Sequence, residues 1–266
     1  WYSYGKKQWA NAVVLKDRYD ENTIYDLSGN GNNASIHGAT MTDEGLYFDG
    51  IDDYAKLDLL DLKETDQITI EFEASFPNDE QIGVPFEIST NFNQYYNSFA
   101  IVINDGAKNS FYFADIFYGT EYNAKSVNNV LSKDYKTYTI TFNTANEYDK
   151  FTSIYINGIK QNLITQSEYH TGDVSGQKFN NYPFFIGSRG GDNLFTEMTL
   201  KSLKIYTKES TEEEVNNNLN NNIVSDKLIL MYDFNNYSDN DVIPEEVIES
   251  YFVWIPKYKY KLWNMG

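Results

Sequence analysis

The sequence predicts an all-β protein: an antiparallel β-sandwich of the jelly-roll type with one short helix, plus a small module formed by the two chain ends. Three observations carry this prediction. The 266 residues include 23 Tyr and 17 Phe, and aromatic rings pack well across the strands of a sheet. Short runs of alternating polarity, separated by turn residues, recur from about residue 45 onward. All four Trp residues lie near the chain ends.

The predicted strands follow one another along the middle of the chain. They cover residues 45–50, 53–59, 67–76, 99–105, 110–119, 135–143, 151–158, 184–188 and 195–208. The run QITIEFEASF (67–76) shows the pattern most clearly, because its apolar residues alternate with Thr69, Glu71, Glu73 and Ser75. Such alternation is typical of an antiparallel strand with one face in the core and the other in solvent.

Turn residues predict how these strands connect. The first two strands have the pattern of a hairpin, with residues 50–52 as its turn. The Asn-Gly pair at 157–158 is a strong two-residue turn signal. The run 195–208 is long enough to be bulged or broken in two. One short helix is predicted within 210–222, where a capping Ser or Thr precedes several Glu residues.

Charge and tryptophan divide the chain into two compositions. Residues 1–18 and 251–266 each carry a net charge of +3, whereas the whole chain carries −18, so the middle carries −24. The simplest arrangement is a jelly roll of residues 19–223 inserted into a small aromatic, basic module made of residues 1–18 and 224–266. The alternative is two unrelated tails. If the module forms assembly contacts, we expect them to involve Trp1, Trp9, Trp254 and Trp263.

The composition excludes several classes of protein. Because the chain has no Cys, it has neither a disulfide framework nor a thiolate metal site. The net charge of −18 and the lack of a basic stripe argue against nucleic-acid binding. No apolar run is long enough to span a membrane, and no signal peptide opens the chain. We therefore expect a soluble or already processed piece, which can belong to a longer protein.

The stretch DLSGNGNNASIHG (26–38) predicts a shaped loop, because Gly and Asn adopt positive φ angles. Its first half matches the opening of a calcium-binding loop, with oxygen-bearing side chains at the first, third and fifth positions and Gly at the sixth. His37 stands where a bidentate Glu should close the cage, so the stretch is either half a metal site or a simple turn. With a nearby Asp pair added, the candidate Ca²⁺ ligands are Asp26, Ser28, Asn30, Asp52 and Asp53.

The segment IYDLSGNGNNASIHGATMTDEGLYFDGIDDYAKL (24–57) resembles the opening of laminin-G-like, concanavalin A-like jelly-roll domains of bacterial surface proteins. Those domains show a similar Asp, Ser, Gly and Asn loop, then Phe-Asp-Gly and a paired Asp. The likeness continues through YTITFN, IYINGIKQ and FIGSR to LKSLKIYTKESTEEEVNNN, and so covers about residues 20–222. It implies the jelly-roll fold. It also implies calcium, which related domains often bind, without fixing the ligands.

The chain ends carry a second, looser likeness. WYSYGKKQWANAVVL (1–15) and EEVIESYFVWIPKYKYKLWN (245–264) resemble adjacent segments of a Trp-Ile-Pro-rich module in surface and pilus-like proteins of Gram-positive bacteria. About 230 residues separate the two segments here, which fits the insertion. The resemblance implies a cell-surface context.

Catalysis is not expected. Glucan-cleaving enzymes of this fold place Glu-x-Asp-x-x-Glu on one strand so that alternate carboxylates share a cleft, and no such run occurs. The nearest pair, Glu71 and Glu73, is interpreted as a solvated strand face. No G-x-S-x-G motif is present either.

Aromatic, Asn-rich loops are the best candidates for ligand binding, since sugar sites combine an exposed ring with polar groups. The alternative is that Tyr and Asn simply decorate loops in this chain. The candidate ligand-binding residues are Tyr95, Tyr96, Tyr118, Tyr122 and Tyr182. We expect a non-catalytic, extracellular surface protein whose jelly roll binds a glycan or a protein. The alternative is a structural display domain or a subunit of a surface fibre, with self-association through the terminal segments.

Overall fold

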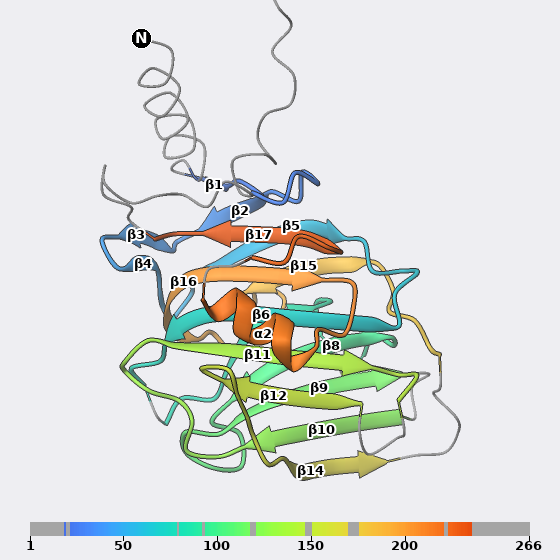
Figure 1. Ribbon diagram of the computed structural model, residues 1–266. Coiled ribbons are helices and arrows are strands. Elements are labelled where there is room, and N and C mark those ends of the chain that lie inside the picture. The colour runs from blue at the N-terminus through green and yellow to red at the C-terminus, as the bar shows by residue number, and fades with distance from the viewer. Residues whose placement is uncertain are drawn as a thin grey trace, which may run out of the picture.

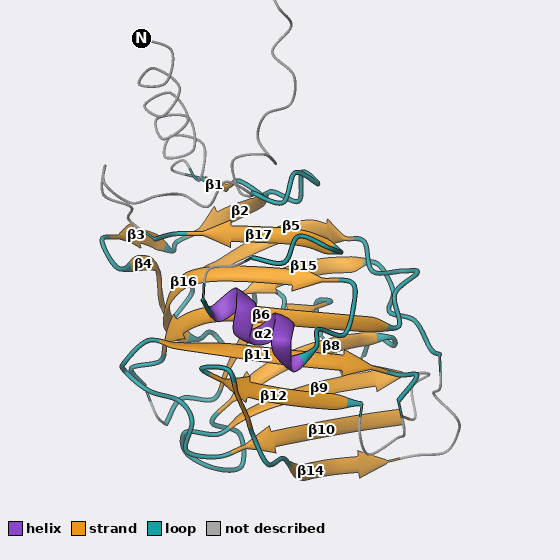
Figure 2. Ribbon diagram, in the orientation of Figure 1, coloured by secondary structure: helices purple, strands orange, loops and turns teal. Residues whose placement is uncertain are grey.

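The structure is a computed structural model that describes residue 19 and residues 22–78, 80–91, 94–117, 121–146, 151–169, 176–220 and 223–235. Over these residues two antiparallel sheets stack face to face (Figure 1). Strands dominate, and one helix lies outside the sheets (Figure 2). The predicted β-sandwich with one short helix is confirmed. None of the helical segments among these residues has the length and hydropathy to cross a membrane.

The described strands fall into a nine-stranded and an eight-stranded sheet. The nine-stranded sheet contains, in spatial order, β1 (Thr23–Ile24), β2 (Ala34–His37), β5 (Tyr54–Leu60), β15 (Tyr182–Ile186), β7 (Gly83–Ile88), β8 (Ser98–Ile103), β9 (Phe111–Phe117), β10 (Glu121–Val127) and β14 (Ile164–Tyr169). The eight-stranded sheet contains β13 (Ile159–Lys160), β12 (Thr152–Ile156), β11 (Lys136–Asn143), β6 (Gln67–Ser75), β16 (Glu197–Tyr206), β4 (Gly45–Asp49) and β3 (Thr40–Thr42), with β17 (Leu228–Asp233) also paired to β16.

Most sequence patterns lead to the predicted elements. The apolar face of β6 is buried throughout, as its alternation requires. Asn157 and Gly158 both have positive φ, 49° and 75°, and turn the chain from β12 into β13. β16 is one continuous strand, and its pairing with β6 shifts register between Leu200 and Ser202, so the predicted bulge is present.

β4 and β5 do not form the predicted hairpin. β4 pairs with β3 and β16, whereas β5 pairs with β2 and β15 in the other sheet. The short segment between them therefore crosses from one sheet to the other. Hydrogen bonds shape this corner, because Asp53 Oδ2 accepts from the Asp49 N–H at 2.9 Å and Asp49 Oδ1 accepts from the Ile51 N–H at 2.8 Å. Crossing places Phe48 and Ala55 in the same core.

Aromatic side chains fill the space between the sheets. Phe72 of β6 meets Phe86 of β7 with ring centroids 4.7 Å apart, and Phe113 of β9 meets Phe142 of β11 at 5.3 Å. Both pairs join the two sheets, and all four rings are fully buried. Burial raises the pKa of Tyr138, which stacks on Phe72 in the same core. The high Tyr and Phe content thus serves the core of the sandwich.

The jelly roll extends past the predicted boundary at residue 223. β17 begins at Leu228 and pairs with β16 along five register positions, so it belongs to the eight-stranded sheet and not to a separate terminal module. The apolar run LILMYD of β17 was not predicted as a strand, because it lies between charged and Asn-rich segments. The assembly candidates Trp1, Trp9, Trp254 and Trp263 lie outside the described residues, so the inserted arrangement stays a prediction.

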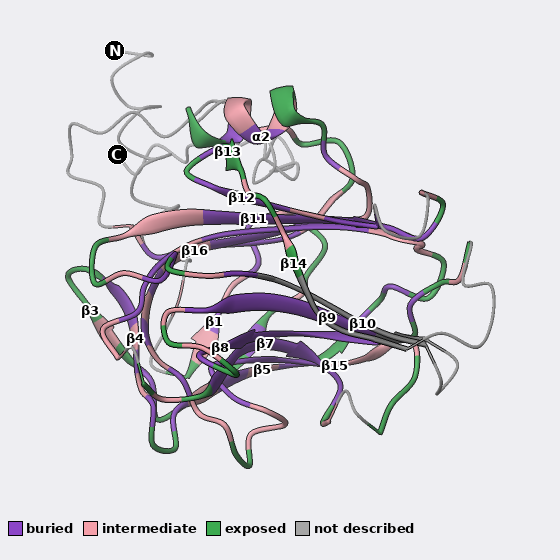
Figure 3. Ribbon diagram, turned by 90° about the horizontal axis from the view of Figure 1, so that it is seen from below, coloured by how far each residue is buried: buried purple, intermediate pink, exposed green. Residues whose placement is uncertain are grey.

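Helix α2 (Glu212–Leu219) covers part of the outer face of the eight-stranded sheet (Figure 3). Thr211 caps it: Thr211 Oγ1 accepts from the Glu214 N–H, and the Glu214 carboxylate accepts from the Thr211 N–H. The predicted capped helix is confirmed. Because α2 lies on this face, Glu71 is only 3% exposed, so the interpretation of Glu71 as part of a solvated strand face is wrong.

Candidate functional site

Two loops at one end of the nine-stranded sheet bring three of the predicted ligand-binding tyrosines together. Tyr95 and Tyr96 lie in the loop between β7 and β8, and Tyr182 opens β15, the neighbour of β7. The Tyr95 and Tyr182 rings meet edge to face, with centroids 5.4 Å apart. We call these three residues the tyrosine surface.

Hydrogen bonds between the loops fix the tyrosine surface. The Tyr182 hydroxyl donates to the Tyr96 carbonyl at 3.0 Å, and Asn180 Nδ2 donates to the same carbonyl at 3.2 Å. The Asn180 N–H also donates to the Asn97 carbonyl at 2.9 Å. Asn97 has a φ of 60°, a conformation that Asn adopts more readily than most residues. The two loops therefore hold each other in place.

The tyrosine surface presents rings and hydroxyls to solvent. Tyr95 is 39% exposed and Tyr96 is 50% exposed, while Tyr182 is half-buried. Among the described residues, no group accepts from or donates to the hydroxyls of Tyr95 and Tyr96. These phenols can therefore serve a ligand as both donor and acceptor.

Sequence reasoning found part of this surface and missed part. Tyr118 lies outside the described residues, as does the side chain of Tyr122, whose backbone is in β10. Asn180 and Asn181 were not singled out. Asn181 directly precedes β15, and its Oδ1 accepts from the Leu62 and Lys63 N–H groups at 3.0 and 2.7 Å. These bonds connect the start of β15 to the segment that follows β5. The Asn-rich composition around Tyr182 was the only available signal for these two residues.

The loop that opens with Asp26 binds to β17. Both Asp26 carboxylate oxygens accept hydrogen bonds, from the N–H groups of Ser28, Asn32 and Met231 and from the Ser28 hydroxyl. Asn32 Nδ2 donates to the Ile229 carbonyl at 2.7 Å. β17 pairs with β16 on one side only, so the loop satisfies backbone groups on its other edge.

The carboxylates of Asp49, Asp52 and Asp53 form a separate cluster, which we call the aspartate triad. Their ligand atoms all lie within 4.8 Å of one another. Asp53 is nearly buried, and this burial is the main reason that the pKa of its carboxyl group is raised. The hydrogen bond from the Asp49 N–H opposes the rise, and the charges of Asp49 and Asp52 add smaller contributions to it. Three hard oxygen donors fit the coordination chemistry of Ca²⁺. Asp49, the third member, was not predicted as a ligand, although it is the central residue of the Phe-Asp-Gly stretch.

The fold does not join the two predicted halves of a calcium cage. Strand β2 lies between them: the Asp26 loop enters it at Ala34, while the Asp53 carboxylate lies against Gly38, beyond its other end. Four strand residues span about 10 Å between their first and last Cα atoms, whereas ligands of one Ca²⁺ lie about 2.4 Å from the ion. A cage shared by Asp26, Ser28, Asn30 and the Asp pair is therefore not formed.

The aspartate triad is also remote from the tyrosine surface. Asp53 directly precedes β5, and Tyr182 pairs with Leu60 at the opposite end of that strand. The seven residues of β5 span about 20 Å. An ion at the triad would therefore not touch a ligand at the tyrosine surface.

The two stacked antiparallel sheets define a β-sandwich protein. The chain belongs to the concanavalin A-like lectin/glucanases superfamily, because the Laminin_G_3 family model matches residues 49–216. The laminin-G-like resemblance is thereby confirmed. A search of curated proteins found no match in sequence.

Solved structures with a similar fold include receptor-binding domains of botulinum neurotoxins. The C/D mosaic domain has a TM-score of 0.56 at 11% identity, and the DC domain in complex with rat synaptotagmin II has 0.55 at 14%; each match covers 76% of this chain and 49% of the other. The serotype D domain in complex with N-acetylneuraminic acid has 0.55 at 12% and covers 80% and 52%. This chain thus spans about half of those domains, and the likeness shows the fold alone.

Proposed function

We propose that this chain is a non-catalytic recognition domain that acts outside the cell, at a cell surface, and binds a glycan through the tyrosine surface. The observation that carries this proposal is the pair of exposed Tyr rings, Tyr95 and Tyr96, held by hydrogen-bonded loops beside Tyr182. A sugar presents an apolar C–H face and a rim of hydroxyls. An exposed phenol ring offers contacts to both.

The fixed loops favour affinity. Asn180 and Tyr182 already hold the Tyr96 carbonyl, so a ligand does not have to order the loop itself. Ordering a loop on binding costs free energy that a rigid surface avoids.

The charge of the chain favours an uncharged glycan. A net charge of −18 repels anionic polysaccharides unless a cation bridges them. The aspartate triad is too far from the tyrosine surface to supply that bridge. A neutral oligosaccharide fits both observations.

The relatives of this fold support recognition in general. The similar C/D mosaic neurotoxin domain is a receptor-binding domain. The serotype D domain is a ligand-binding domain seen with N-acetylneuraminic acid, and the DC domain is a binding domain seen with synaptotagmin II. Because this chain spans only half of those domains, neither ligand transfers to it. A protein partner is the second candidate.

The carboxylates of the eight-stranded sheet give no support to glucanase activity. Glycosidases need two carboxyl groups facing one cleft, one of them free to exchange a proton. Glu71 instead accepts from Lys204 Nζ at 2.7 Å and from Asn218 Nδ2 at 3.2 Å. This is why we propose a binding domain within a superfamily that also contains glucanases.

A glycan array of neutral and sialylated oligosaccharides, probed with the full chain, tests the proposal. We expect binding to a neutral glycan, and a loss of about tenfold or more in affinity for Tyr96→Ala, since truncating an aromatic residue at the centre of a binding surface costs about 2 kcal/mol or more. Ile159→Ala is the matched control, because Ile159 is also an exposed apolar side chain but lies in the other sheet. Equal losses in both variants, or preference for sialylated glycans, would contradict the proposal.

Two predictions from the sequence remain beside this proposal. Calcium stays a prediction, and among the described residues the aspartate triad is the group that could hold it. The display or fibre alternative depends on the terminal Trp residues. Its test is the molar mass of the full chain in solution.

A further inference from the structure

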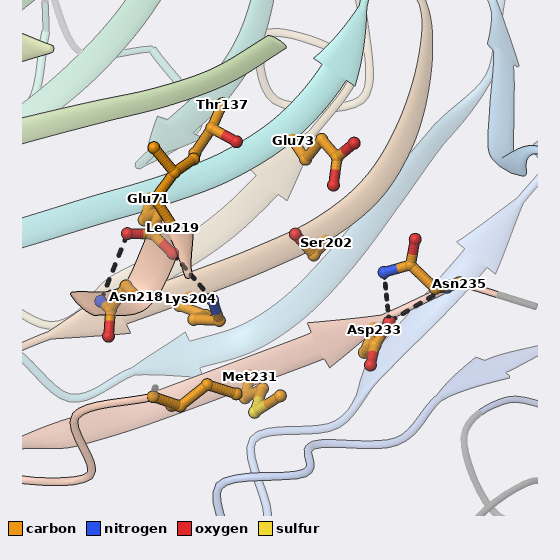
Figure 4. A pocket seen from close by; sticks show the side chains of 11 residues that line it. Glu71, Glu73, Thr137, Ser202, Lys204, Asn218, Leu219, Met231, Asp233 and Asn235 are labelled. Atoms are coloured by element: carbon orange, nitrogen blue, oxygen red, sulfur yellow. Dashed lines mark hydrogen bonds and ion pairs between the residues drawn. The ribbon is translucent and has the colours of Figure 1, made fainter. Parts of the chain in front are cut away.

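Strand register builds a polar pocket on the outer face of the eight-stranded sheet. Four neighbouring strands, β11, β6, β16 and β17, align one row of side chains: Thr137, Glu73, Ser202 and Asp233. The next row on the same face contains Glu71, Lys204 and Met231. With the last residues of α2 as a wall, the two rows border a pocket of about 70 Å³ (Figure 4).

One side of the pocket offers hydrogen-bond donors. Glu71 and Lys204 are both nearly buried and form an ion pair at 2.7 Å, and Asn218 donates to the second Glu71 oxygen. The Lys204 ammonium has three N–H donors, but among the described residues only Glu71 Oε1 accepts from it. A buried ammonium with two remaining donors needs acceptors, and the pocket is where they can be supplied.

The other side offers acceptors and apolar surface. The Glu73 carboxylate is a third exposed, and its ion pair with Lys201 is long, at 3.8 Å. Asp233 and Asn235 lie on the same side as Glu73 in Figure 4, across the hollow from Lys204 and Asn218. The side chains of Leu219 and Met231 add apolar contacts to the lining.

We propose that this pocket binds an uncharged polyhydroxy ligand, the edge of a monosaccharide residue. A hydroxyl group both donates and accepts, so it can satisfy Lys204 on one side and Glu73 on the other. The Glu73 and Asp233 carboxylates would repel an anion in the pocket, and the Lys204 ammonium would repel a cation. The pocket is large enough for several water-sized groups, which matches neighbouring hydroxyls on one sugar edge. The pocket and the tyrosine surface lie on different sheets, so this proposal does not rest on the proposed function.

Saturation-transfer NMR on the full chain tests the pocket, with D-glucose, D-galactose and N-acetyl-D-glucosamine as probes at millimolar concentration. We expect saturable binding of at least one sugar. Glu73→Gln should weaken it up to about tenfold, because a charge-assisted hydrogen bond becomes a neutral one of about half the strength. Ser202→Leu should abolish it by filling the pocket. Neither change touches the Glu71–Lys204 pair, and unchanged thermal midpoints would show that both variants fold.

Tyr96→Ala is the control that separates the two sites. Binding retained in Tyr96→Ala and weakened in Glu73→Gln supports the pocket, even if the tyrosine surface binds nothing. Binding lost in Tyr96→Ala but kept in Glu73→Gln and Ser202→Leu would assign the sugar to the tyrosine surface and overturn the proposal. Absence of binding by all three sugars, or binding of methylammonium in their place, would also overturn it.

Discussion

Gly38 shows how one residue positions the aspartate triad. Its φ is +82°, and a Cβ atom built on it would lie 2.0 Å from Asp53 Oδ1. Only Gly therefore allows the Asp53 carboxylate to lie over the end of β2 while Asp53 Oδ2 bonds to the Asp49 N–H. The corner between β4 and β5 depends on this close approach.

We predict that Gly38→Ala destabilises the protein by more than the backbone strain of about 1–2 kcal/mol that an L-residue meets at this φ. The excess arises because the Asp53 carboxylate must move. Urea unfolding measures the difference in free energy of unfolding. Gly31→Ala is the matched control, since Gly31 has a φ of +78° but nothing within 4 Å of its Cβ position. Equal destabilisation of the two variants would show that the contact with Asp53 contributes nothing.

At the scale of elements, short-range signals specify α2, but distant residues decide what it covers. The capping box of Thr211 and Glu214 lies within four residues. By contrast, Asn218 of α2 meets Glu71 of β6, a residue 147 positions away in the chain. The local sequence therefore sets where the helix begins. The polar residue Asn218 on the face that packs on the sheet is explained only by its contact with Glu71.

Thr211→Ala should cost about 1 kcal/mol of stability, because the Glu214 N–H loses its acceptor. Amide hydrogen exchange across residues 212–219 should speed up, while exchange in β6 stays unchanged. Thr211→Ser keeps a capping hydroxyl and serves as the control. If the serine variant exchanged as fast as the alanine variant, the hydroxyl would not be what holds the start of α2.

The sequence did not predict β7 and β17, nor the strands β1, β2, β3, β10, β13 and β14. The loop prediction for residues 26–38 is wrong at its end, because Ala34–His37 form strand β2. Pro85 interrupts the β7 run, and the pairing of β7 with β8 shifts register between Gly83 and Phe86 around it. β17 was not predicted, because residues from 224 onward were interpreted as part of a separate terminal module with a different composition. The Asp26 loop then bonds to the outer edge of β17, so the stretch that suggested calcium instead completes a sheet edge.

At the scale of the whole molecule, we expect calcium binding to increase the free energy of unfolding. An ion that binds only the folded state raises its stability by about 2.7 kcal/mol at a concentration of 100 times Kd. We expect the thermal midpoint of the chelated protein to rise and saturate with added Ca²⁺. Asp52→Asn should remove this rise without unfolding the chain, because Asp52 is exposed.

Asp58→Asn is the control for that experiment, since Asp58 is an exposed carboxylate on β5 outside the aspartate triad. It should respond to Ca²⁺ as the unchanged protein does. A thermal midpoint that does not respond to millimolar Ca²⁺ would contradict the prediction that the protein binds calcium. The aspartate triad would then only shape the corner between β4 and β5.

The sequence by itself determined the class of fold and nine of the seventeen described strands. The alternation in β6, the Asn-Gly turn at 157–158 and the cap at Thr211 are local patterns, complete within about ten residues, and each led to the expected element. Such patterns reflect backbone preference and one buried face, which short segments carry on their own. The motifs of residues 24–57 likewise indicated the superfamily.

Only the tertiary structure decided which residues share a site. It joined Tyr95 to Tyr182, separated Asp26 from Asp53, and buried Glu71 against Lys204, 133 residues later in the chain. The physical reason is that strand order and sheet crossing are set by how whole faces pack, and no local pattern records them. β4 and β5 illustrate this, because their sequences predict two strands correctly but do not show that the strands belong to different sheets.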